Sequence, residues 1–110
     1  MKSKTLKENK DFRRLYYRGR TCASSCIVTY IMKSRLGETR VGITSGKKIG
    51  NAVKRNRARR LIRAAFSEYE NSLNGCYDIV FVARTRTAEV KMQEVQQQME
   101  EQLKKLGALS

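Results

Sequence analysis

Hydrophobic positions recur with a helical period in three stretches of the chain. In residues 7–18 the apolar side chains share one face, and Gly19 follows as a stop signal. Asn51 is a suitable N-cap for a second helix, which we expect to run to about Tyr69. A third apolar pattern with helical spacing covers residues 88–106. The sequence therefore predicts helices in all three stretches.

Between these stretches, segments rich in β-branched and aromatic residues predict strands. The first covers residues 26–33 and the second covers residues 40–45, with an expected hairpin loop at 34–39. Residues 77–84 form the most hydrophobic strand, which we expect to lie at the centre of the sheet. A short extra strand near 21–23 is compatible with the pattern. The order α-β-β-α-β-α indicates the α+β class, with helices packed against one small sheet.

Length and charge restrict the function. The chain has 110 residues, which is one domain, residues 1–110. Its 24 basic and 10 acidic residues give a net charge of +14, so nucleic acid is the leading partner class. Histidine is absent, which excludes Ser/His and Cys/His catalytic sites. No apolar run or leader-like segment stands out, so we expect a cytoplasmic protein with no membrane partner.

The cysteines do not indicate a metal site or a disulfide framework. Cys22, Cys26 and Cys76 make an odd count, and no fourth thiol or histidine is present to complete a zinc site. We expect them to behave as small buried apolar residues, and we expect no metal ligands in the chain.

Positive charge is concentrated on the second predicted helix. No acidic residue occurs between Glu38 and Glu68. At 100° per residue, one face of this helix is apolar: Leu61, Ala65, Ala58, Tyr69, Ile62 and Phe66. The other face carries Arg59, Arg63, Asn56, Arg60 and Arg57. A solvated helix face normally mixes charges, because like charges destabilise it, so this face indicates a polyanionic partner. The sequence shows neither zipper heptads nor a helix-turn-helix pattern, which favours structured RNA over DNA.

The stretch Arg40–Phe66, RVGITSGKKIGNAVKRNRARRLIRAAF, closely resembles the signature of the bacterial ribonuclease P protein subunit. The resemblance extends over essentially the whole chain. It includes a DFxxxY block before Gly19, a tyrosine-bearing strand, a DIVFVAR strand and a C-terminal amphipathic helix.

This resemblance implies that the catalyst is an RNA and that the protein is its cofactor. The complex hydrolyses one phosphodiester of precursor tRNA, removes the 5′ leader and leaves a 5′-phosphate. The implied partners are the catalytic RNA, with one protein monomer per RNA, and precursor tRNA. Mg²⁺ is expected to be held mainly by the RNA, with no organic cofactor. A left-handed βαβ crossover is also implied, against the usual handedness.

The resemblance assigns no catalytic residue to the protein, and it assigns two binding sets. The set expected to bind the catalytic RNA is Lys47, Lys48, Asn51, Lys54, Arg55, Asn56, Arg57, Arg59, Arg60 and Arg63. The set expected to bind the leader is Phe12, Arg13, Tyr16 and Tyr30. Stacking on aromatic rings is a common way of holding single-stranded RNA.

Several residues keep a second interpretation. Asn56 could make a local hydrogen bond, Phe12 could pack in the core, and ungapped counting places Thr29 rather than Tyr30 in the leader cleft. Tyr17 and Tyr77 are interpreted as structural. We expect additional phosphate contacts from other arginines near the first helix: Arg14, Arg18 and Arg20.

Two other functions share the basic helix. One is a ribosomal or other structured-RNA binding protein without a role in cleavage, and the other is a sequence-tolerant DNA-binding protein. The ten acidic residues are scattered along the chain, which argues against two-metal hydrolysis by the protein itself.

Overall fold

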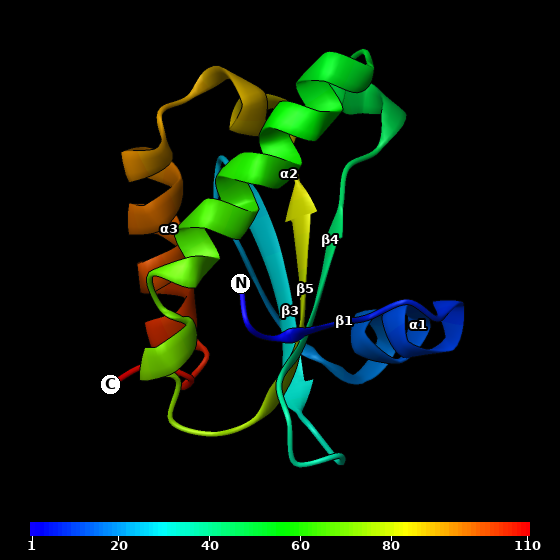
Figure 1. Cartoon of the computed structure of the whole chain (residues 1–110), viewed down its shortest axis with the longest axis vertical. Helices are drawn as coiled ribbons and strands as arrows, with labels where there is room; N and C mark the ends of the chain where they lie inside the picture. Colours follow the sequence, from blue (N-terminus) through cyan, green and yellow to red (C-terminus); the bar gives the residue numbers. More distant parts are fainter.

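A five-stranded mixed sheet separates one helix from two others in the computed structural model, which describes residues 1–110 (Figure 1). The strands are β1 (Lys4–Thr5), β2 (Arg20–Ala23), β3 (Ile27–Lys33), β4 (Arg40–Thr44) and β5 (Tyr77–Ala83). The helices are α1 (Asn9–Arg18), α2 (Ala52–Ser67) and α3 (Met92–Lys105). Short 3₁₀ turns, η1 (Lys47–Ile49), η2 (Glu70–Ser72) and η3 (Thr85–Glu89), lie in the connections. The α+β class is confirmed.

The sheet has the order β1-β4-β5-β3-β2, with β5 at its centre as predicted. The predicted hairpin between β3 and β4 is wrong, because β5 lies between them, antiparallel to β3 and parallel to β4. All but one of the β5 residues are buried, so the backbone N–H and C=O groups of this strand lie away from water and need hydrogen-bond partners on both edges. The actual hairpin joins β3 to β2, which confirms the short extra strand.

The connection from β4 through α2 to β5 is a left-handed crossover. In Figure 1, α2 lies in front of the sheet, β4 and β5 both run upward, and β5 lies to the left of β4. Most parallel strand pairs are joined with the opposite hand. The expectation from the family resemblance is therefore confirmed.

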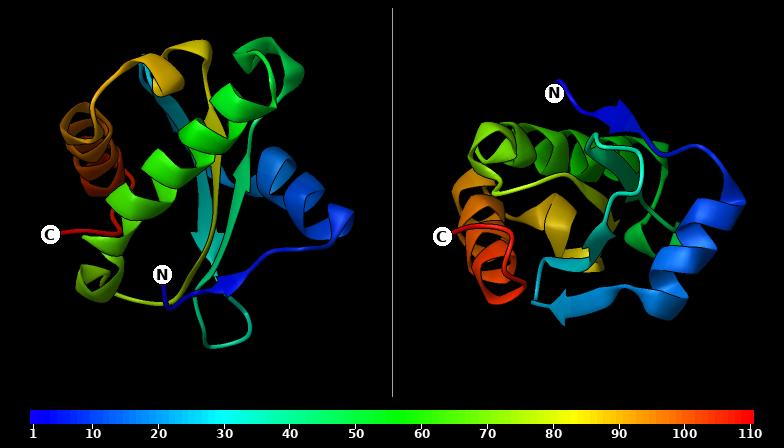
Figure 2. Two further views of the ribbon diagram at one scale, coloured as in Figure 1. Left: turned by 45° about the horizontal axis from the view of Figure 1, so that its top comes forward. Right: turned by 90° about the horizontal axis from the view of Figure 1, so that it is seen from below.

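Each face of the sheet has its own core. Helices α2 and α3 cover one face over a cluster that includes Ile27, Ile31 and Phe81. Helix α1 covers the opposite face over a smaller cluster built on Leu6, Leu15 and Val80 (Figure 2).

The alternation of side chains along β3 shows which of Tyr30 and Thr29 lies on the same face of the sheet as α1. Tyr30 packs against the cluster below α1. Thr29 is fully buried on the other face, where its hydroxyl donates a hydrogen bond to Gln102 Oε1. Tyr30, and not Thr29, therefore lies on the α1 face.

The helix boundaries follow local signals in two cases. Lys54 N–H donates to Asn51 Oδ1 at 3.0 Å, so the predicted N-cap of α2 is confirmed. Gly50 has a φ of 131°, a conformation that favours glycine and that turns η1 into α2. The predicted start of the third helix at residue 88 is wrong, because Thr85–Glu89 is a 3₁₀ turn and α3 begins at Met92.

Thr87 explains the delayed start of α3. Its hydroxyl accepts a hydrogen bond from Arg84 N–H at 2.9 Å and donates one to the Cys26 carbonyl, and the residue is fully buried. These bonds fix a tight turn before the helix.

No helix of the protein is both long and apolar enough to cross a bilayer.

The three cysteines occupy different environments, and none is in a disulfide. Cys26 is fully buried, and burial together with the neighbouring Glu94 carboxylate raises the pKa of its thiol. Cys22 is half-buried, whereas Cys76 is exposed. The prediction of buried apolar cysteines is therefore wrong for Cys76, which lies in the loop before β5.

Strand β1 was not predicted, because it has only two residues and both side chains are exposed. The segment before it is anchored to Glu70 by hydrogen bonds from Ser3 Oγ at 2.6 Å and from the backbone N–H groups of Ser3 at 2.7 Å and Lys2 at 2.9 Å. Burial acts to raise the pKa of Glu70, but these hydrogen bonds outweigh burial, and the pKa lies below its ordinary value.

We expect this anchor to weaken at acid pH. Because the pKa of Glu70 is lowered in the folded state, its stabilisation is complete above the unfolded value of about 4.3 and is lost as the pH falls through the folded value. NMR shifts of the Lys4 and Leu6 amides, which bond to Thr39 and Val41, should report release of β1 below about pH 4. Glu70→Gln should abolish this pH dependence. A wild-type β1 that is insensitive to acid would contradict the assignment.

Candidate nucleic-acid interface

Helix α2 has the two faces that its sequence predicts. Its buried residues are Ala58, Ile62, Ala65 and Phe66, which pack between the sheet and α3. The basic residues occupy the remaining surface, and none of the ion pairs in the chain includes a residue of α2. The charge of this helix is therefore not neutralised within the chain.

Three of its arginines bond to backbone carbonyls of the chain. Arg55 Nη1 donates to Gly50 O at 3.3 Å, Arg57 Nε to Ala88 O at 2.9 Å, and Arg59 Nη1 to Ile43 O at 2.8 Å. A guanidinium has five N–H donors, so each side chain retains donors for a phosphate while its position is fixed. These arginines orient the cationic face as well as charging it.

The other polar residues of this face make no hydrogen bond within the chain. Asn56, Arg60 and Arg63 line a shallow hollow of about 410 Å³ together with Val53, which is 72% exposed. These positions are three or four residues apart, so they form one stripe along the helix. The local hydrogen bond that was the alternative for Asn56 is not present, and its amide faces solvent.

The predicted residues before the helix extend the cationic surface. Lys47 and Lys48 are exposed on η1, and Lys54 is exposed in the first turn of α2. The side-chain oxygen of Asn51 caps α2, as predicted, so this oxygen is already occupied by a hydrogen bond. Its amide group can still donate to an anion at the helix N-terminus.

A second candidate surface lies between α1 and the sheet. Asn9, Phe12, Arg13, Tyr16 and Thr44 line a hollow of about 570 Å³ there, which we call the α1 groove. Its aromatic rings are half-buried or exposed, so they are available for stacking.

Tyr30 supports the α1 groove from below. Its ring meets the Tyr16 ring edge to face, with centroids 4.9 Å apart and planes at 77°. Tyr30 itself does not line the hollow, so it is connected to the α1 groove only through its contact with Tyr16.

Phe12 is held over Gly42 of β4. A Cβ atom added at Gly42 would lie 2.6 Å from Phe12 Cζ, which is too close for any real contact. Phe12 therefore packs on the sheet, and it also lines the α1 groove. Its binding to the leader stays a prediction.

Gly42→Ala should displace the Phe12 ring. We expect a loss of about 1–3 kcal/mol in the free energy of unfolding, the usual effect of overpacking, measured by urea denaturation. Phe12→Leu in the same chain should recover part of the loss. Gly46→Ala is the matched control, because no atom lies within 4 Å of the added Cβ. Equal stability of the two alanine variants would contradict this packing.

A buried ion-pair network attaches α1 to the sheet, and no pattern in the sequence predicts it. The Asp78 carboxylate accepts from Arg40 Nε at 3.0 Å, Arg40 Nη2 at 2.9 Å and Arg14 Nη2 at 3.2 Å. Asp11 of α1 lies 3.3 Å from Arg14 and 3.5 Å from Arg40. The hydrogen bonds to Asp78 raise the pKa of Arg40. A carboxylate in the most hydrophobic strand was the available sequence signal.

These contacts change the roles of two arginines expected to bind phosphate. Arg14 is committed to this network, and Arg20 Nη2 donates to the Leu106 carbonyl. Arg13 and Arg18 are exposed on α1 and remain available.

The chain has no cluster of three or more His, Cys, Asp or Glu side chains that could hold a metal ion. The two carboxylates that come together, Asp11 and Asp78, are both bound by arginines. The side chains therefore do not fit a bound Mg²⁺.

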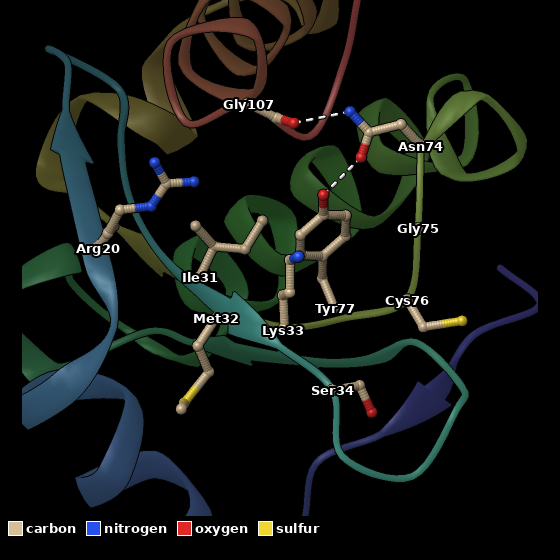
Figure 3. A pocket seen from close by; sticks show the side chains of 10 residues that line it. All are labelled: Arg20, Ile31, Met32, Lys33, Ser34, Asn74, Gly75, Cys76, Tyr77 and Gly107. Carbon is tan, nitrogen blue, oxygen red and sulfur yellow. Dashed lines mark hydrogen bonds between the residues drawn. The ribbon is translucent and has the colours of Figure 1, made fainter.

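A further hollow of about 710 Å³ lies at the C-terminal end of β3, next to the segment before β5 (Figure 3). Of the residues predicted to contact RNA, only Arg20 lines it, and the Arg20 side chain donates a hydrogen bond to the Leu106 carbonyl. Within it, Tyr77 donates a hydrogen bond to Asn74, and Asn74 donates one to the Gly107 carbonyl. Tyr77 is thus structural, as predicted.

A cationic helix face and a separate aromatic groove on an α+β sheet define a small nucleic-acid-binding protein. A model of the family described as Ribonuclease P matches residues 1–107. The chain belongs to the bacterial ribonuclease P protein family, whose members bind RNA as the protein component of a tRNA-processing endoribonuclease.

Individual relatives support this membership over nearly the full length. The chain is 34% identical to the ribonuclease P protein component of Alkaliphilus metalliredigens, over 96% of this chain and 95% of the relative. It is 40% identical to that of Caldanaerobacter subterraneus, over 91% and 86%. The solved structure of the Staphylococcus aureus RNase P protein superposes with a TM-score of 0.86 and 31% identity, covering 99% of this chain and 100% of that one.

Proposed function

We propose that this chain is the RNA-binding cofactor of ribonuclease P, with α2 on the catalytic RNA and the α1 groove on the 5′ leader of precursor tRNA. The complex removes the leader by hydrolysis and leaves a 5′-phosphate on the mature tRNA. The observation that carries the proposal is the stripe of Asn56, Arg60 and Arg63, which is charged and has no partner within the chain.

We assign the catalytic RNA to α2 because this helix carries many positive side chains and no negative ones. Such charges repel one another at adjacent turns, and a polyanion removes that repulsion while releasing its own counterions. Arginine also grips phosphate in a planar, bidentate way that lysine cannot match. The carbonyl bonds of Arg55, Arg57 and Arg59 hold three guanidinium groups in place before the RNA arrives.

The leader suits the α1 groove because a single strand exposes its bases. Phe12 and Tyr16 offer aromatic faces for stacking, and Arg13 offers a charge for the adjoining phosphate. A double helix buries its bases, so the same rings would gain little from duplex RNA.

The chemistry is assigned to the RNA partner. The chain lacks histidine, and its paired carboxylates are occupied by arginines, so no side chain is placed to act as a general base. We assign the Mg²⁺ ions to the RNA, with no organic cofactor. We further propose one monomer per RNA, acting in the cytoplasm.

Groove variants test the leader assignment. Tyr16→Ala should weaken binding of precursor tRNA to the reconstituted complex about tenfold, but only when the leader is present. Its affinity for the catalytic RNA should not change. Leu36→Ala, which removes an exposed apolar side chain from the 34–39 loop, is the control.

Equal weakening with leaderless tRNA would refute the groove assignment. A chain that binds many folded RNAs equally, with no dependence on the leader, would instead favour the general structured-RNA binder.

A further inference from the structure

Tyr17 is the most exposed large hydrophobic side chain of the protein, at 92%. Its neighbour Tyr16 packs against Tyr30, whereas Tyr17 has no aromatic partner and makes no hydrogen bond. The prediction that Tyr17 is structural is therefore wrong. Nothing in the folded chain accounts for a large aromatic ring at this position.

The surroundings of Tyr17 are cationic. The ring shares a hollow of about 460 Å³ with Lys10, Arg13, Arg14 and Arg18, on the face of α1 that points away from the sheet. We call this surface the outer α1 face. Two of these cations have acidic partners, since Lys10 Nζ lies 3.3 Å from Glu8 Oε2 and Arg14 binds Asp11 and Asp78. Arg13 and Arg18 form no ion pair within the chain, so the surface keeps an unneutralised positive charge.

An exposed ring among cations is suited to unpaired nucleotides. A base stacks on the ring, and the phosphates on each side of it meet lysine or arginine. Arginine can also stack on the base itself. A phosphate-only contact would not need the ring.

Arg13 connects the outer α1 face to the α1 groove, because it lines both hollows. A strand that leaves the groove over Arg13 therefore reaches Tyr17 without leaving positive charge. The groove's other border, Thr44, ends the strand whose Ile43 carbonyl binds Arg59 of α2. The catalytic RNA on α2 is thus nearer to the groove than to the outer face.

We propose that Tyr17 and its basic neighbours form a second stacking site for the leader, which takes nucleotides farther from the cleavage site than those in the groove. This inference rests on the proposed leader-binding role of the groove. It predicts that the protein distinguishes long leaders from short ones.

The test uses the complex of this chain with a bacterial ribonuclease P RNA. Precursor tRNAs carry leaders of increasing length, with the fluorescent base 2-aminopurine at one leader position at a time. Wild-type complexes should show fluorescence quenching by stacking at two separate sets of positions. Tyr17→Ala should relieve only the distal set and weaken binding of long leaders about tenfold, while short leaders bind normally.

Tyr17→Phe is the matched control, because it keeps the ring and should behave as wild type. Tyr16→Ala should relieve the proximal set only. Tyr17 is almost fully exposed, so its replacement should leave the circular dichroism and the unfolding midpoint unchanged.

If Tyr17→Ala matches wild type at every leader length while Tyr16→Ala weakens binding, this inference is wrong and the proposed function stands. If Tyr17→Ala weakens binding regardless of leader length, the outer α1 face does not hold the leader. If neither variant responds to the leader, the leader-binding role of the groove itself fails.

Discussion

Asp78→Ala should cost about 3 kcal/mol in the free energy of unfolding, the largest stability effect expected for one residue of this protein. The Asp78 side chain is 1% exposed, and its removal leaves the Arg40 and Arg14 guanidinium groups without their shared partner. Their side chains are 16% and 29% exposed, so water can compensate in part, which places the expected loss at the lower end for buried pairs. Total stabilities of such domains are about 5–15 kcal/mol, so this loss is large.

Urea denaturation measures this effect through the transition midpoint at constant slope. Asp78→Asn should lie between wild type and Asp78→Ala, because the amide keeps one acceptor but loses the charge. Glu38→Ala removes an exposed acidic side chain from the 34–39 loop and serves as the charge control. A loss below about 1 kcal/mol, the level of a surface ion pair, would mean that the network does not hold α1 on the sheet.

The second large effect concerns RNA affinity. Replacing Arg60 and Arg63 together with alanine should weaken binding to the catalytic RNA about 100-fold, or about tenfold for each lost phosphate contact. Neither side chain has a partner within the chain, so stability should not fall. Removing like charges from adjacent turns should even raise it by a few tenths of a kcal/mol.

The salt dependence of RNA affinity distinguishes direct phosphate contacts of α2 from general attraction by the protein's net charge. With six or more phosphate contacts, wild-type affinity should fall about 10³-fold between about 50 and 200 mM salt. The double variant should show a shallower slope, by roughly 0.9 for each lost contact. The control Lys33→Ala/Arg35→Ala removes the same charge from exposed positions at the end of β3 and after it. An equal change of affinity and slope in both variants would mean that α2 does not contact the RNA directly.

Local features of the candidate site could be predicted from the sequence. The cap at Asn51 and the two faces of α2 both depend on residues three or four positions apart. Such local patterns can be recognised directly in the sequence. The aromatic block of α1 followed from its resemblance to the family. The contact of this block with Tyr30 follows from the alternation of side chains along β3, which places Tyr30 on the α1 face of the sheet.

Long-range features could not be predicted in this way. The 34–39 loop is short enough for a hairpin, so its length predicts that β3 pairs with β4. In the structure β5 lies between these two strands and is almost fully buried, and this pairing depends on residues far apart in the chain. The ion pairs of Asp78 with Arg14 and Arg40 join residues that are far apart in the chain. The exposure of Tyr17 depends on how α1 docks, which no periodicity reports.

The most direct test of the account is the rate of precursor tRNA cleavage by a bacterial ribonuclease P RNA at low Mg²⁺, with and without this chain. We expect faster cleavage at the mature 5′ end, with a 5′-phosphate on the product, and loss of the stimulation with Arg60→Ala. Tight binding to the RNA without any stimulation of cleavage would contradict it.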